Sequence, residues 1–254
     1  MIKLEGVDYQ YHEHVALSQI NLEIQAGERV VLLGNNGSGK STLLKLLAGL
    51  IFAQEGRYLF EGKVVNKRQL KRDAKAFRKA LAILFQNPDT MLFNPTVREE
   101  ILFSLLQFDM ERDIEALAEE FDIASLLERS PLKLSGGEKQ KVALCAIFAT
   151  EPKVLLLDEP MANLDPKSTG WLIDFLEEQE GLTTLISTHN LSLARELGTR
   201  AIVMDASHTI IYDGAIEALF ENQEVLLQAN LMHRHRHKHA DATLHSHFHL
   251  HNWS

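Results

Sequence analysis

Cysteine is almost absent from this chain, which has a single one, Cys145, in 254 residues. One cysteine cannot form a disulfide within the chain, so the sequence excludes a disulfide-stapled framework. The residue lies in the apolar run VALCAI, 142–147. We therefore expect a small buried core side chain there rather than a nucleophile or a metal ligand.

Long hydrophobic runs are also missing. No apolar stretch reaches the roughly 18 residues that a membrane-spanning helix needs, and no charged-then-apolar leader is visible at the start. We expect a cytosolic protein that spans no membrane by itself. Any role at a membrane would then require a partner protein.

Positive charge is in deficit, with 26 Lys and Arg against 35 Asp and Glu and a net charge of -9. This balance argues against a chain-wide basic face for nucleic acid, although it leaves room for a local patch. The hydrophobic fraction of 45% is that of a globular protein and is sufficient for a full core in one domain.

Continuous apolar runs alternate with segments of helical spacing, which is typical of a layered α/β sheet. The patterns predict strands at 20–24, 29–33, 57–62, 154–160, 183–188 and 200–205. They predict helices at 43–50, 169–180 and 191–198. Apolar periodicity ends near residue 230. We assign 1–230 to one domain, with a helical subdomain inserted at about 96–147, and 231–254 to a disordered histidine-rich tail.

A phosphate-binding loop of the form G-x-x-x-x-G-K-[ST] follows the predicted strand at 29–33 and precedes a predicted helix, as this motif requires. It comprises Gly34, Asn35, Asn36, Gly37, Ser38, Gly39, Lys40 and Ser41. Glycines let successive backbone N–H groups and the helix N-terminus face phosphates. Lys40 would add a positive charge there, and the Ser41 hydroxyl would ligate Mg²⁺.

A carboxylate pair, Asp158 and Glu159, ends the apolar run at 154–157. The carboxyl end of a buried strand lies beside the phosphate loop in open α/β sheets. We expect Asp158 to hold Mg²⁺ through water. Glu159 is placed to orient or deprotonate a water that attacks the γ-phosphate.

The segment LSGGEKQKVAL, 134–144, resembles the signature motif of ABC-type ATPases. The similarity extends from Ile2 to about Gly214, with the motifs in the order usual for that family. It implies an ABC-ATPase core with a mixed sheet, ATP hydrolysis, and a dimer in which two cassettes sandwich two ATP molecules. A monomer should therefore hydrolyse ATP poorly.

The resemblance also implies roles for individual residues. Gln86 would contact Mg²⁺ and sense a membrane partner, while His189 would contact the γ-phosphate and act in catalysis with Glu159, Gln86 and Lys40. It implies further nucleotide-binding residues outside the phosphate loop. Tyr11 would stack on adenine, Thr42 would bind beside the loop, and Asp165 would lie at the dimer seam. The signature would contribute Ser135, Gly136 and Gly137.

Several of these assignments have alternatives. Tyr9 competes with Tyr11 for the adenine, and His189 could simply cap the following helix. Glu138 stands where glutamine is more usual in the signature. His208 replaces part of a glycine-containing turn and is read as a turn residue rather than a stray ligand.

The stretch LFQNPDTMLFNPTVREEI, 84–101, resembles the glutamine-loop region of ATPases from energy-coupling-factor importers of the cobalt, nickel and biotin group. This implies a transmembrane coupling subunit, a substrate-binding membrane subunit, and peripheral attachment at the cytoplasmic face of the membrane. Met91, Leu92, Phe93 and Val97 would line the docking groove, although local core packing is the alternative.

Histidine recurs at every second position in two runs near the end. The residues are His233, His235, His237, His239, His245, His247, His249 and His251. Alternate residues of an extended chain share one side, and imidazole is the commonest protein metal ligand. We expect the tail to bind Ni²⁺, Co²⁺ or Zn²⁺, as a buffer or as feedback on transport.

Other functions stay open at this level. A biotin or other vitamin importer would use the same ATPase. A nickel-inserting P-loop GTPase would need N-K-x-D for guanine, and NKRQ at 66–69 lacks the aspartate. A soluble ABC ATPase of DNA repair or translation would bring a coiled-coil insertion or a second cassette, and a metal-storage protein would not need a hydrolysis site. Nucleic acid is not an expected partner.

Overall fold

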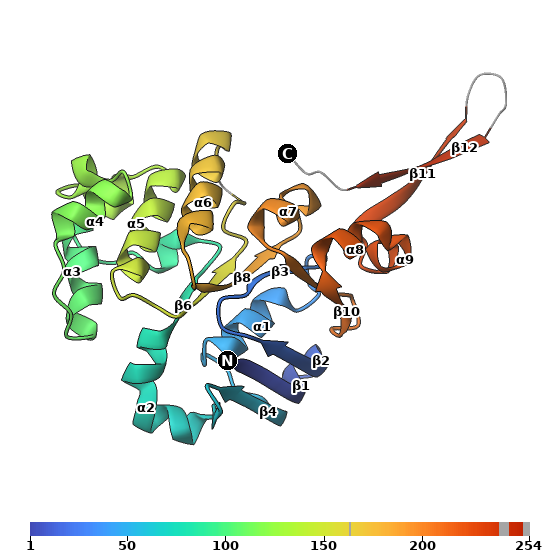
Figure 1. Cartoon of the computed structure of the whole chain (residues 1–254), viewed down its shortest axis with the longest axis horizontal. Coiled ribbons are helices and arrows are strands. Elements are labelled where there is room, and N and C mark those ends of the chain that lie inside the picture. The colour runs from blue at the N-terminus through green and yellow to red at the C-terminus, as the bar shows by residue number, and fades with distance from the viewer. Residues whose placement is uncertain (163, 239–243, 251–254) are drawn as a thin grey trace.

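The computed structural model describes residues 1–162, 164–238 and 244–250 (Figure 1). A six-stranded sheet forms the centre of the molecule, in the order β10, β9, β3, β8, β7, β6. Its strands are β3 (Arg29–Leu33), β6 (Leu81–Leu84), β7 (Val154–Asp158), β8 (Thr183–Thr188), β9 (Arg200–Met204) and β10 (Ile210–Ala215). Five of them run parallel and β10 is antiparallel to β9, so the sheet is mixed.

Both faces of this sheet are covered, which explains its continuous apolar runs. Successive residues of a strand point to opposite faces. Val30 and Leu32 accordingly belong to one buried cluster, and Val31 and Leu33 belong to the other. The strands predicted from apolar runs are confirmed.

A second, antiparallel sheet lies on one side, in the order β2, β1, β4, β5. Its strands are β1 (Ile2–Tyr11), β2 (His14–Ile24), β4 (Glu55–Phe60) and β5 (Lys63–Val64). Helix α1 (Lys40–Leu47) contributes Leu43, Leu44 and Leu47 to the cluster between the two sheets. The helix that follows the phosphate loop is therefore held by apolar contacts on two sides.

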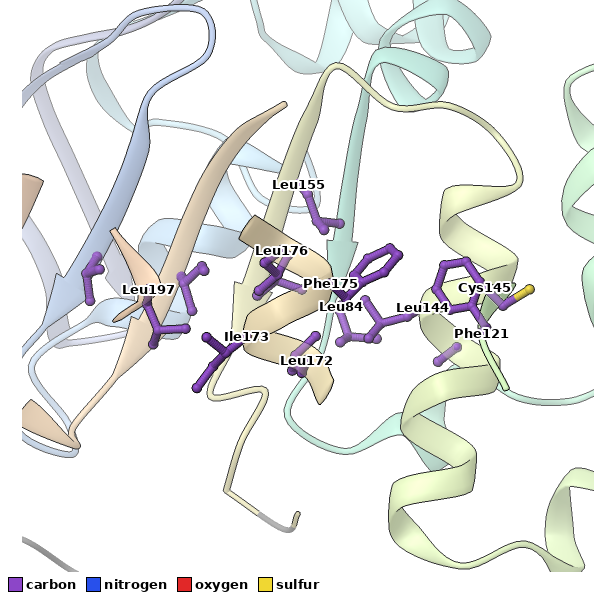
Figure 2. Packing of buried hydrophobic residues seen from close by; sticks show 14 of the residues in the cluster. Leu84, Phe121, Leu144, Cys145, Leu155, Leu172, Ile173, Phe175, Leu176 and Leu197 are labelled. Atoms are coloured by element: carbon purple, nitrogen blue, oxygen red, sulfur yellow. The ribbon is translucent and has the colours of Figure 1, made fainter. Parts of the chain in front are cut away.

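Helices α5 (Gly136–Phe148), α6 (Pro166–Glu178) and α7 (Ala194–Leu197) lie on the other face, while α3 (Val97–Gln107) packs on α5 and α4 (Ile114–Glu120) packs on α3. Short 3-10 turns are η1 (Pro88–Thr90), η2 (Ala124–Leu126), η3 (Pro131–Lys133) and η4 (Leu191–Leu193). Figure 2 shows Phe121 and Phe175, whose ring centroids are 4.8 Å apart, packed with Leu144 and Cys145. Cys145 is buried, and burial raises the pKa of its thiol to about 12. The expected core role of the cysteine is confirmed.

Helices α3, α4 and α5 follow one another between β6 and β7, in the stretch predicted to be helical. Thr96 and Ser135 begin α3 and α5 with capping boxes that pair their side chains with Glu99 and Glu138. Helix α2 (Lys67–Ala80), which lies between β5 and β6, was not predicted from the sequence.

After β10 the chain forms α8 (Ile216–Glu221) and α9 (Gln223–Gln228). Leu231 and Met232 are still buried in the core. In the segment predicted to be a disordered tail, β11 (Met232–Lys238) pairs with β12 (Leu244–Leu250) as an antiparallel ribbon. The division into domains stays a prediction. No helix in the described ranges is long and apolar enough to span a bilayer.

Candidate functional site

The glycine-rich loop connects β3 to α1 at the carboxyl end of the central sheet. Gly34 and Gly39 have φ of +150° and +107°, and no Cβ would fit at either position. A Cβ on Gly34 would lie 2.4 Å from the carbonyl oxygen of Met204, and one on Gly39 would lie 2.4 Å from that of Ala16. Glycine is required here because the loop curls tightly against neighbouring backbone.

The Lys40 side chain points back into this loop and is buried. Its Nζ donates to the carbonyl oxygens of Gly34 at 2.6 Å and Asn35 at 3.3 Å, and it lies 3.5 Å from Oε1 of Glu159. Burial lowers the pKa of Lys40, and the Glu159 carboxylate partly opposes this shift. The loop thus holds the Lys40 ammonium group at its centre.

The two carboxylates are brought to the same place by β7. Asp158 ends the strand, and both side chains are buried. Ser187 of β8 connects them, because its Oγ accepts from the backbone N–H of Glu159 at 2.9 Å and donates to Oδ1 of Asp158 at 2.7 Å. Glu159 has φ of +47°, an uncommon conformation for a residue with a side chain. This serine was missed from sequence, although its place at the end of a buried run was a signal.

His189 follows β8 and lies next to the carboxylate pair. Its Nδ1 is 2.8 Å from Oε2 of Glu159. The other carboxylate oxygen of Glu159, Oε1, has no hydrogen-bond partner in the described part of the chain. The alternative role as a helix cap is wrong, because Asn190 caps η4 by accepting from the backbone N–H of Ser192.

The signature residues begin α5. Ser135 is the N-cap, and the Glu138 carboxylate accepts from the Ser135 backbone N–H at 2.7 Å. A Cβ on Gly137 would lie 2.9 Å from Oγ of Ser168 and 3.8 Å from Oδ2 of Asp165. The signature and Asp165 therefore share one surface, which sequence alone did not place together.

Other predicted residues lie around this centre. Gln86 is exposed at the end of β6 and lines a cavity with Gly136, Gln140 and Pro160. Buried Gln140 donates to the carbonyl oxygen of Pro160 at 3.1 Å, which ties α5 to the residue after Glu159. Exposed positions of the phosphate loop and α1 are Asn35, Asn36, Gly37 and Ser41, while Thr42 is half-buried.

The two aromatic candidates for the adenine contact, Tyr9 and Tyr11, both lie on β1 and touch each other. Tyr11 is 40% exposed, and its ring packs edge-on against Tyr9 with centroids 4.9 Å apart. His208 is a turn residue, as predicted. It has φ of +62°, and its backbone N–H donates to the carbonyl of Asp205 at 3.1 Å.

The expected docking residues need correction. Leu92 and Val97 are buried in the core, and Met91 packs against it, so these three do not line an open groove. Phe93 alone is well exposed, at 66%. Leu102, Phe103 and Leu106 of α3 are also exposed and extend the apolar surface beyond the predicted loop.

Among the tail ligands, His239 and His251 lie outside the described residues. The backbone of the ribbon pairs His233 with His249, His235 with His247, and His237 with His245. In the residues whose side chains are described, no group of three or more His, Cys, Asp and Glu is arranged to hold a metal ion.

A glycine-rich loop between a strand and a helix, with a carboxylate pair at the end of a nearby parallel strand, defines a P-loop nucleotide-binding protein. The family model for ABC transporters matches residues 17–162, and the chain belongs to this family. It is an ABC ATPase domain.

Three curated relatives extend the match over most of the chain. A putative ABC transporter ATP-binding protein of Caldanaerobacter subterraneus is 42% identical, over 91% of this chain and 99% of the relative. The nickel import ATP-binding protein NikO of Rhodobacter capsulatus is 36% identical, over 91% and 93%. The energy-coupling factor ATP-binding protein EcfA of Methanothermobacter thermautotrophicus is 34% identical, over 91% and 76%.

Two solved structures share the fold. CbiO1 of Clostridium perfringens, part of the CbiONQ transporter complex, has a TM-score of 0.74 and 30% identity, over 91% of this chain and 94% of its own. A dimeric ATP-binding cassette with bound ADP and phosphate has a TM-score of 0.74 and 28% identity, over 85% and 99%. The predicted ABC-ATPase fold is confirmed.

Proposed function

We propose that this chain is the ATP-hydrolysing subunit of an energy-coupling-factor type importer for Ni²⁺ or Co²⁺. The contacts of buried Glu159 with buried Lys40 and partly exposed His189 carry the hydrolytic part of this proposal. The importer class is supported by similarity to NikO, EcfA and CbiO1.

The site residues have distinct roles in this mechanism. Lys40 and the backbone N–H groups of the phosphate loop bind and orient the ATP phosphates. Ser41, Gln86 and Asp158 would hold Mg²⁺, which fits their hydroxyl, amide and carboxylate oxygens and neutralises phosphate charge when bound. Ser187 keeps Asp158 and the Glu159 backbone in fixed positions.

Glu159 is the general base for the attacking water. Its Oε2 is engaged by His189, whereas Oε1 lies 3.5 Å from Nζ of Lys40, has no hydrogen bond in the described chain, and is the atom that would accept the proton. His189 holds this carboxylate and would contact the γ-phosphate. The reaction is direct transfer of the γ-phosphoryl group to water, giving ADP and phosphate.

Two copies would complete the sites. The shared surface of Gly137 and Asp165 would face the phosphate loop of a second copy, together with Ser135 and Gly136. Tyr11 would stack on the adenine. The similarity to a cassette solved as a dimer with ADP and phosphate supports this arrangement.

Glu159→Gln tests the catalytic assignment. The substitution removes the base and keeps the shape, so ATP binding and dimerisation with ATP should persist while turnover falls by roughly 10²–10⁴-fold. Glu177→Gln, an exposed carboxylate of α6, is the control and should hydrolyse ATP normally. Near-normal steady-state hydrolysis by purified Glu159→Gln would refute the role.

The tail is proposed to bind Ni²⁺, Co²⁺ or Zn²⁺ at the cytoplasmic side of the importer. Residues directly opposite in an antiparallel ribbon are neighbours on one face. The backbone register therefore supports a row of adjacent imidazoles. It is formed by three cross-strand pairs, His233 with His249, His235 with His247 and His237 with His245. His239 and His251 are proposed as further ligands from the sequence alone.

A further inference from the structure

Helix α2 carries a concentration of positive charge that the proposed mechanism does not use. It contains seven of the 26 Lys and Arg residues in 14 positions, but only one of the 35 Asp and Glu residues. The chain as a whole has a net charge of -9. A strongly basic helix is therefore present in a chain whose overall net charge is negative.

Helix α2 is kinked at Asp73, and the basic side chains on both sides of the kink are exposed to solvent. Phe77 is buried and packs edge-on against Phe60 with ring centroids 5.3 Å apart, and Leu70 packs against the same cluster. Asn66 caps the helix by accepting from two backbone N–H groups. Six exposed cations of α2 form no ion pair with the described residues, namely Lys67, Arg68, Lys71, Arg72, Arg78 and Lys79.

The remaining cation of α2, Lys75, links this helix to the exposed apolar surface. Lys75 forms an ion pair with Asp109, in the turn that follows α3. Helix α3 exposes Leu102, Phe103 and Leu106, which continue the surface around Phe93. A basic helix thus borders the exposed apolar surface at which we expect the membrane subunit to dock.

We propose that α2 is an electrostatic contact for anionic phospholipid headgroups. This proposal rests on the proposed importer function. In the importer, α2 would lie against the cytoplasmic leaflet while the exposed apolar surface binds the membrane subunit. Clusters of Lys and Arg at such a surface bind anionic lipids without inserting apolar side chains. The apolar side of α2 is occupied by its own core, so the contact is electrostatic and weakens with salt.

Full-length protein is mixed with phosphatidylcholine vesicles, with and without phosphatidylglycerol, and vesicle-bound protein is measured by flotation. A chelator keeps the tail metal-free, and a pH above the histidine value of about 6.5 keeps its histidines neutral, while its Arg and Lys residues are the same in every variant. Binding should require phosphatidylglycerol and be lost at high salt. The triple variant Lys71→Gln, Arg72→Gln, Lys79→Gln should bind at least about tenfold more weakly, because each cation near an anionic leaflet is worth roughly fivefold in affinity.

A matched variant carries Lys3→Gln, Arg57→Gln and Arg195→Gln, which removes the same charge at exposed positions elsewhere. It should keep its lipid binding. Equal binding by the two triple variants, or equal binding to pure phosphatidylcholine, would overturn the proposal. Tighter binding to duplex DNA than to anionic vesicles, lost in the α2 variant, would instead make α2 a nucleic-acid surface. Because the vesicles contain no membrane subunit, these outcomes are independent of the Glu159→Gln assay.

Discussion

At the scale of single residues, Glu138 shows how a departure from a family pattern can be absorbed locally. It stands where glutamine is more usual, and its carboxylate accepts the backbone N–H of Ser135 in a capping box. Hydrogen bonds from Ser135 lower the pKa of Glu138 below its ordinary value of 4.5. A negative charge also suits the first turn of a helix.

Glu138→Gln should therefore change stability in a pH-dependent way. A lowered folded-state pKa means that the anion stabilises the fold above about pH 4.5 and that this contribution is lost as pH falls through the folded value. We expect the variant to lose about 0.5 kcal/mol at neutral pH and to match the parent protein in acid. Urea unfolding at both pH values measures this, with Glu177→Gln as control. A pH-independent difference would contradict it.

At the scale of elements, α3 and the loop before it form one exposed apolar surface. The Phe93 ring packs edge-on against Phe103 with centroids 5.0 Å apart. Buried Glu100 fixes the loop by accepting the backbone N–H groups of Phe93 at 2.9 Å and Asn94 at 2.8 Å. The loop is thus rigid at its backbone while Phe93 projects outward, as a docking surface requires.

Phe93→Asp should weaken co-purification with the membrane subunits and reduce uptake, while the isolated ATPase stays folded and binds ATP. The reason is that interface cores are depleted of charge and tolerate an unpaired carboxylate poorly. Leu227→Asp changes another exposed apolar side chain, 38% exposed, in α9 at the opposite end of the molecule from α3 (Figure 1), and is the control. Unchanged assembly of Phe93→Asp would show that the surface is not the interface.

At the scale of the whole molecule, the histidine-rich segment is a separate ribbon that begins where the core ends. Leu231 and Met232 pack in the core, whereas the next residue is the first histidine of the predicted metal row. Removal of the tail should leave the core intact if the cut follows Met232 rather than Asn230.

Truncation after Met232 should preserve folding, dimerisation and basal ATP hydrolysis but abolish most Ni²⁺ or Co²⁺ binding measured by calorimetry at neutral pH. In the full chain, binding should weaken below about pH 6.5, because ligation requires neutral imidazole. Arg234→Gln with Arg236→Gln keeps every histidine and should keep metal binding. Equal metal binding by full-length and truncated protein would contradict the proposal.

The sequence alone determined the parts of this protein that depend on neighbouring residues in the chain. The phosphate loop was readable because its glycines, Lys40 and Ser41 are consecutive and lie between a strand and a helix. The carboxylate pair was readable because it ends an apolar run. Both patterns are local consequences of backbone geometry and burial.

Only the tertiary structure decided which distant residues meet. Ser187 reaches Asp158 because β7 and β8 are parallel neighbours, and Gly137 meets Ser168 because α5 and α6 pack together. The structure also separated buried Val97 from exposed Phe93 within one apolar stretch. Such contacts depend on strand order and packing between segments far apart in the chain, and a linear pattern carries no measure of either.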